Sequence, residues 1–165
     1  MNDPRMQIPA ALALLAATVS VVTDVGTRRI PNWLTGGTLL LGLIVNALIG
    51  GWSGLALAGA GAALGLALLL PFFAMNVMGA GDVKLLAALG AVVGPRELIS
   101  VALYAAVAGG VLSAIILARQ GRLMVTLEEI VVRRVPPTRG GAKAPYAVAI
   151  AAGVYCSMLL PAVVT

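Results

Sequence analysis

The chain contains no histidine and only one cysteine among its 165 residues. Without histidine, the chain cannot form the Ser–His or Cys–His catalytic sets, in which an imidazole is the general base. Because Cys156 is the only thiol, the chain has neither an internal disulfide framework nor a four-cysteine zinc site. We therefore expect no metal and no cofactor, and any catalysis must use other side chains.

Charged residues are also scarce. Only 10% of the residues are charged, 61% are hydrophobic and the mean hydropathy is +1.05. Soluble globular proteins carry roughly a quarter charged residues, so this composition indicates an integral membrane protein. The length suits a single membrane-embedded domain over residues 1–165. The net charge of +5 does not indicate a nucleic-acid partner, because the basic residues sit in short segments between apolar runs.

The apolar residues form six continuous runs, separated by glycine, proline and charged residues. Continuous runs favour helices over a lipid-facing barrel, whose strands alternate apolar and polar residues. We predict an all-α polytopic membrane protein with six transmembrane helices in one bundle. The predicted spans are about residues 8–23, 33–49, 55–74, 83–93, 98–118 and 146–164.

The basic residues are distributed unevenly over the loops. All but two of the eleven, Arg5 and Arg96, lie in or beside the first, third and fifth loops. The positive-inside rule then places these three loops in the cytoplasm and both termini outside. In the fifth loop, apolar residues recur at helical spacing among charged ones over about residues 120–135. We expect an amphipathic helix on the cytoplasmic leaflet there. Its preferred role is that of an interfacial linker that holds the topology, and the alternative role is substrate docking.

Two carboxylates lie at span ends on the predicted cytoplasmic side. Asp24 follows the first run, and Asp82 closes the tetrapeptide Gly79-Ala80-Gly81-Asp82 before the fourth. An ionisable group at the edge of hydrocarbon is costly without water or a partner, so each is a candidate functional residue. The fourth run is also too short to cross the hydrocarbon core. This favours a wet cavity at Asp82 or a helix that begins earlier.

Two close carboxylates in a partly desolvated site share a proton, so that one activates water while the other protonates a scissile carbonyl. This is the chemistry of aspartic proteases, and it needs no metal or histidine. The glycines before Asp82 would let an extended peptide approach. The structural alternative is that Asp24 caps a turn and Asp82 caps the fourth helix.

These residues carry a family resemblance. The segment from Asp24 to Asn32, with the pattern D-x-x-x-x-R-I-P-N, together with Gly79–Leu85, resembles the two-part signature of the type IV prepilin peptidases. These are intramembrane aspartic proteases of the GxGD type, and the six-span layout is similar too. The resemblance implies that Asp24 and Asp82 are the catalytic pair.

The resemblance also implies a substrate and a location. Such enzymes remove the short basic leader from prepilins, just before the hydrophobic helix of the pilin, at the cytoplasmic face of the bacterial inner membrane. Pseudopilins are further candidate substrates. The larger members also N-methylate the product and carry a cytoplasmic insert with four cysteines. This chain lacks that insert, so it is similar to the short peptidase-only form of Flp or tight-adherence pilus systems.

Several further residues of the two motifs are weaker candidates for binding substrate or shaping the site. Arg28, Arg29 and Lys84 would steer an acidic residue of the pilin or pair with the dyad, but cytoplasmic anchoring by positive charge explains them adequately and is the preferred interpretation. Asn32 is a candidate cap of the second span. The other members of this weaker set are Gly79, Gly81 and Pro31.

Two other classes of function compete with the peptidase. In a small ion or proton channel or transporter, an intramembrane carboxylate pair would mark the transport path. A midplane site and an inverted repeat would favour that class, but both aspartates lie near one surface and no repeat is visible. A non-catalytic pilus assembly protein with both aspartates is the other alternative.

Overall fold

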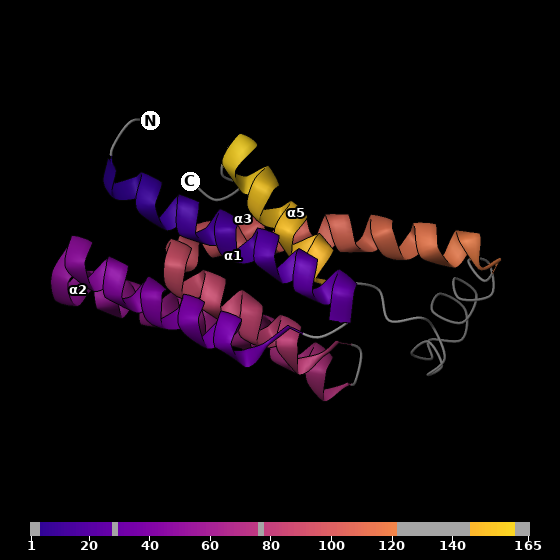
Figure 1. Cartoon of the computed structure of the whole chain (residues 1–165), viewed down its shortest axis with the longest axis horizontal. Coiled ribbons are helices and arrows are strands. Elements are labelled where there is room, and N and C mark those ends of the chain that lie inside the picture. The colour runs from indigo at the N-terminus through magenta and orange to yellow at the C-terminus, as the bar shows by residue number, and fades with distance from the viewer. Residues whose placement is uncertain (1–3, 28–29, 76–77, 122–145, 161–165) are drawn as a thin grey trace.

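The computed structural model describes residues 4–27, 30–75, 78–121 and 146–160, which form four helices (Figure 1). These are α1 (Pro4–Thr27), α2 (Asn32–Ala74), α3 (Ala80–Arg119) and α5 (Tyr146–Leu159). No strand occurs within these ranges, so the all-α prediction is confirmed. Three stretches, Gln7–Thr27, Asn32–Ala74 and Ala80–Arg119, are long and apolar enough to cross a membrane. The chain is therefore a helical membrane protein.

Two of the helices change direction at a glycine. Gly51 in α2 has φ 60° and ψ −139°, and Gly94 in α3 has φ 81° and ψ 172°. Such backbone is strained for any residue with a side chain, which explains glycine at both points. Beyond Gly51, Gly54 lies against the backbone carbonyl of Asn46, so the second arm of α2 returns alongside the first.

The predicted count of six separate spans is not confirmed, because the described residues form four helices. Gly51 and Gly94 nevertheless lie in two of the breaks expected between spans. At 1.5 Å per residue, α2 without its reversal would be about 65 Å long, roughly twice the hydrocarbon thickness. Its reversal divides it into two arms of about membrane length.

The first arm of α3, residues 80–93, packs against both arms of α2. Gly42 on the first α2 arm lies against Ala91 and Val92, and Gly61 on the second arm lies against Gly90. Small residues let helix backbones approach closely in a membrane, where no hydrophobic effect drives helices together. The α3 arm whose first turn contains Asp82 is thereby held against α2 by close contacts between the helix backbones.

Asn46 supports the point where α3 turns. Pro95 has no N–H, so the helical partner of the Ala91 carbonyl is missing. The Asn46 side-chain amide donates to the carbonyls of Ala91, Val92 and Gly42, each at 3.0 Å. An amide from α2 thus satisfies backbone acceptors that the turn in α3 leaves open.

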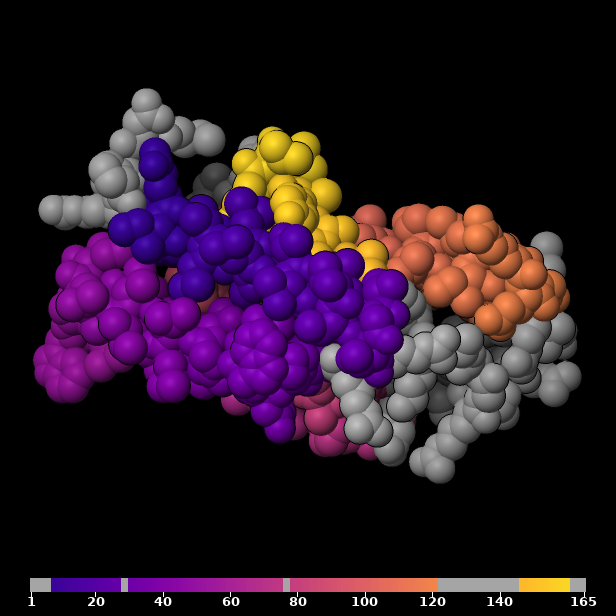
Figure 2. All heavy atoms as spheres, in the orientation of Figure 1, coloured from indigo at the N-terminus to yellow at the C-terminus, as the bar shows by residue number. Residues whose placement is uncertain are grey.

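Helices α1 and α5 complete the bundle. Gly153 of α5 lies against Val101 and Ala105 in the second arm of α3, and the Thr18 and Tyr155 hydroxyls of α1 and α5 are 2.8 Å apart. In the space-filling view, α1 and α2 lie next to each other across the near face (Figure 2). The buried core draws on α1, α3 and α5: Ala13, Ala16, Ala17, Leu85, Leu86, Leu89, Val92, Leu98, Val101, Ala147, Ile150, Ala151 and Val154.

Three sequence-based predictions fall outside the described residues. They concern Arg28 and Arg29, most of the amphipathic segment expected at about residues 120–135, and the final residues of the last span.

Candidate active site

One end of the bundle brings together the two sequence motifs. Here α1 ends at Thr27 while α2 begins at Asn32 and α3 at Ala80, and we call it the Asp82 end (Figure 1). Two contacts join the segments. The Lys84 ammonium donates to the Asn32 side-chain oxygen at 3.0 Å, and a Cβ on Gly81 would lie 3.2 Å from the Ile30 Cβ.

Asp82 occupies the first turn of α3 and is buried, with 9% of its surface exposed. Its carboxylate accepts a hydrogen bond from the Gly79 N–H at 3.3 Å, and its own N–H donates to the Gly79 carbonyl at 3.2 Å. This reciprocal pair caps the helix, and the positive end of the helix dipole favours the anion there. The capping role considered for Asp82 is therefore real, with Gly79 as the N-cap residue.

Different neighbouring groups explain why glycine is favoured at each of the two glycine positions of the tetrapeptide. A Cβ on Gly79 would lie 3.3 Å from an Asp82 carboxylate oxygen, and one on Gly81 would press on Ile30. Each distance is tight enough that the neighbouring group would have to move. The absence of a side chain at Gly79 thus leaves the Asp82 carboxylate its place in the helix cap, and at Gly81 it allows the chain after α1 to lie against α3.

Asp24 lies in the last turn of α1 and is partly buried. Three residues later α1 ends, and Ile30 then contacts Gly81 at the start of α3. Both candidate catalytic residues consequently lie at the Asp82 end. One carboxylate is fixed by a helix cap, and the other belongs to a neighbouring helix.

The prediction that Asn32 caps the second span is wrong. Pro31 is the N-cap residue, with extended backbone at φ −69° and ψ 141°, and no side chain caps the helix. The Pro31 carbonyl instead accepts from the Leu34 N–H at 3.1 Å. Because Asn32 is one residue inside the helix, its side chain is free to reach across to Lys84.

Within the described ranges, no three Asp, Glu, Cys or His residues gather as a metal site would require. What the Asp82 end offers is general acid–base chemistry by carboxylates and an ammonium held by an amide. Sequence reasoning did not single out Ile30, although it lies inside the R-I-P-N motif, because an apolar residue carries no chemical signal.

Comparison with known families supports the peptidase over the channel or transporter. The sequence pattern of the type IV leader peptidase family matches residues 11–114, which is more than half of the chain. The chain belongs to the type IV leader peptidase family. The match runs from α1 into the second arm of α3 and includes Asp24, Asp82 and both motifs. No match was found among curated proteins or among solved structures.

Membership in the type IV leader peptidase family makes this chain a protease of the leader-peptidase type, and its long apolar helices make it a membrane protein. The matched region contains all contacts described for the Asp82 end, from Ile30 to Lys84. The site and the family match therefore coincide in the chain.

Proposed function

We propose that this peptidase is an aspartic endopeptidase that removes the leader peptide from type IV prepilins of the Flp type. The reaction takes place at the cytoplasmic face of the bacterial inner membrane, with Asp24 and Asp82 as the catalytic pair. The observation that carries the proposal is the family match over both motifs, combined with the position of both aspartates at one end of the bundle. In this proposal pseudopilins are further substrates. Membrane lipid surrounds the helices.

The proposed reaction is a hydrolysis in which the two carboxylates share one proton. The ionised carboxylate takes a proton from water as the water oxygen attacks the scissile carbonyl carbon. The protonated carboxyl donates its proton to the carbonyl oxygen. As the tetrahedral gem-diol intermediate collapses and the C–N bond breaks, the carboxyl that took the water proton gives it to the leaving amine. The other carboxylate takes back one hydroxyl proton, which restores the starting state of the pair. The Gly79 N–H holds Asp82 in one orientation, which supports a fixed role for this carboxylate.

The product is predicted to carry a free, unmethylated amino terminus, because the chain lacks the cysteine-containing insert of the methylating members. Purified peptidase in liposomes, given a Flp-type prepilin and S-adenosylmethionine, should release one leader peptide. Intact-mass measurement of the pilin should show loss of the leader alone. A product heavier by one methyl group would contradict the peptidase-only assignment. Cleavage lost on adding a chelator would contradict a metal-free mechanism.

We further propose one domain with six crossings, in which the arms of α2 and α3 each span the membrane once. The reversals at Gly51 and Gly94 would then lie on the outer side, opposite the Asp82 end. Single cysteines introduced by Ser53→Cys, Arg96→Cys and Gln120→Cys into a Cys156→Ser background test this arrangement. A membrane-impermeant thiol reagent should label the first two in intact spheroplasts and the third only after lysis. The reverse labelling pattern would place the aspartates on the wrong face for leader removal.

A further inference from the structure

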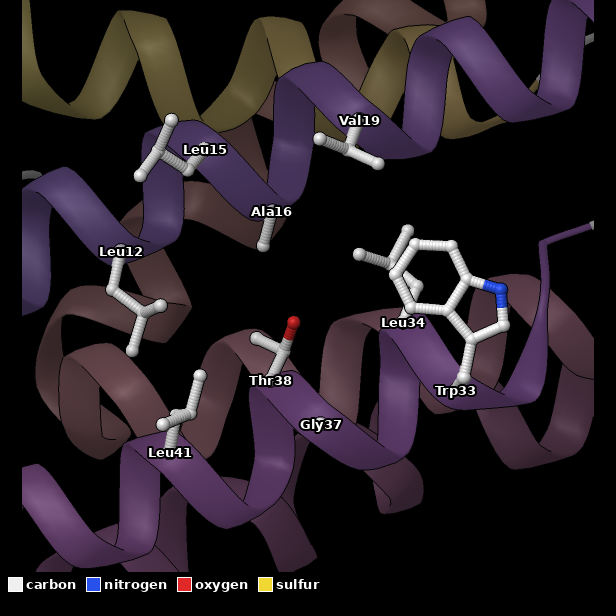
Figure 3. Close-up of a pocket in the computed structure, with 9 residues that line it drawn as sticks. All are labelled: Leu12, Leu15, Ala16, Val19, Trp33, Leu34, Gly37, Thr38 and Leu41. Carbon is white, nitrogen blue, oxygen red and sulfur yellow. The ribbon is translucent and has the colours of Figure 1, made fainter.

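A groove of about 300 Å³ lies between α1 and the first arm of α2 (Figure 3). Side chains of the two helices face one another across it: Leu12, Ala16 and Val19 from α1, and Leu34, Thr38 and Leu41 from α2. The walls are almost entirely apolar, and they belong to two helices that are long and apolar enough to cross a membrane.

The groove begins beside the Asp82 end. On α1 its nearest lining residue, Val19, lies just over one turn before Asp24. On α2 it starts at Trp33, the residue after Asn32, whose side chain bonds to Lys84. From there it follows both helices for about two turns, or roughly 12 Å at 1.5 Å per residue. Its direction is thus from the candidate catalytic residues into the depth of the membrane.

The lining of the groove fits a helix better than an acyl chain. Gly37 lines the groove, and a Cβ added to it would meet nothing within 4 Å, while the buried Ala16 forms the floor of the groove on the α1 side. Small residues mark the places where membrane helices approach closely. Thr38 also directs its hydroxyl toward α1 (Figure 3), and such hydroxyls hydrogen-bond across helix interfaces. An acyl chain offers no partner for a hydroxyl.

We infer that this groove binds the first two turns of the prepilin's hydrophobic helix, the part that directly follows the scissile bond. The inference rests on the proposed function, since it names the surface that presents that substrate. A helix seated here would have its N-terminal end level with Asp24 and the Asp82 end. The scissile bond would then be positioned by apolar contacts made below it in the membrane.

Disulfide crosslinking tests the inference without requiring turnover. An inactive Asp24→Asn, Cys156→Ser peptidase carries a cysteine at Leu15 or Leu41, which are 64% and 49% exposed and line the groove. The control cysteine replaces Val107, which is 67% exposed but lies on the second arm of α3. The prepilin carries single cysteines along the first three turns of its helix.

The groove positions should crosslink to prepilin residues spaced three or four apart within the first two turns, and Val107→Cys should not. Equal crosslinking at Val107→Cys would overturn the inference. So would disulfide-linked peptidase dimers in place of prepilin adducts, which would assign the groove to a second copy. Absence of all adducts would leave lipid as the occupant and would also overturn it.

A matched glycine pair gives the kinetic test. A Gly37→Leu side chain would fill the groove, and this change should raise KM about tenfold with kcat unchanged, as expected for lost ground-state binding. Gly36→Leu is the control, because Gly36 also has open space around it but does not line the groove. Equal effects of the two changes would contradict the inference. Failure of the wild-type enzyme to cleave would refute the proposed function instead, while the crosslinks would still report binding.

Discussion

Asp24→Asn and Asp82→Asn are each expected to reduce prepilin cleavage by at least about 10²-fold, because positioned acid–base groups typically contribute 10²- to 10⁴-fold. An amide can neither take the proton from the attacking water nor donate one as a carboxylic acid does. The measurement is the rate of leader release from co-expressed or reconstituted prepilin, followed by the mobility shift on a gel. Each variant should insert and purify as the wild type does.

Asparagine also separates the two roles of Asp82. Its side-chain oxygen still accepts a hydrogen bond from the Gly79 N–H, so Asp82→Asn preserves the acceptor that caps α3. If Asp82 only capped the helix, Asp82→Asn would therefore retain nearly full activity. Asp82→Ala removes the cap as well and should cost about 1 kcal/mol of stability in addition to the activity.

Glu97→Gln is the matched control for both substitutions. Glu97 is an exposed carboxylate on the same helix as Asp82, but it lies beyond the Gly94 reversal. The same loss of charge there should leave the cleavage rate unchanged. Normal cleavage by a correctly inserted Asp24→Asn or Asp82→Asn variant would rule out the two-aspartate mechanism.

The position of the candidate site could be proposed from the sequence because carboxylates are conspicuous in an apolar chain. Asp24 and Asp82 stood out by their cost at the edge of hydrocarbon, and the family match includes both. The prediction that Asn32 caps the second span was wrong for a local reason. A sequence does not fix a helix end to one residue, and Pro31 takes the cap position with its extended backbone. The Lys84–Asn32 bond depends on where two separate helices begin, which no single segment encodes.

The all-α class and the breaks in the apolar runs followed from composition and from glycine. The contacts between helices could not be predicted, because a glycine in an apolar run carries no information about which residue it contacts. Gly61 lies against Gly90, whereas Gly59 on the same arm has nothing within 4 Å. Asn46 was missed for a similar reason: it lies inside an apolar run, and its acceptors arise from the turn at Pro95.

Gly61→Ala is expected to destabilise the protein by about 1–3 kcal/mol, the usual cost of overpacking a tight contact. The added Cβ would overlap the Gly90 carbonyl oxygen, so the second arm of α2 would have to move away from α3. Because the α3 arm that loses this contact begins with the turn containing Asp82, cleavage should fall together with stability. Thermal unfolding of the purified protein in detergent measures the effect.

Gly59→Ala is the control on the same helix, two residues away. Its methyl group enters open space, and alanine is the better helix former by up to about 1 kcal/mol, so stability should stay level or rise slightly. Equal destabilisation by Gly59→Ala and Gly61→Ala would show that the Gly61–Gly90 contact does not hold the arms together.

The double variant Gly61→Ala, Gly90→Ala tests the contact itself. A Cβ on Gly90 would overlap the Gly61 carbonyl, so either methyl alone forces the same separation of α2 from α3. Once the first methyl has separated the helices, the second fits at little further cost. The double variant should therefore lose less stability than the sum of the single variants, with a coupling energy within the range of about 0.5–3 kcal/mol for residues in contact. Strict additivity would mean that the two glycines act on different contacts, and the close packing of the Asp82 arm would then need another explanation.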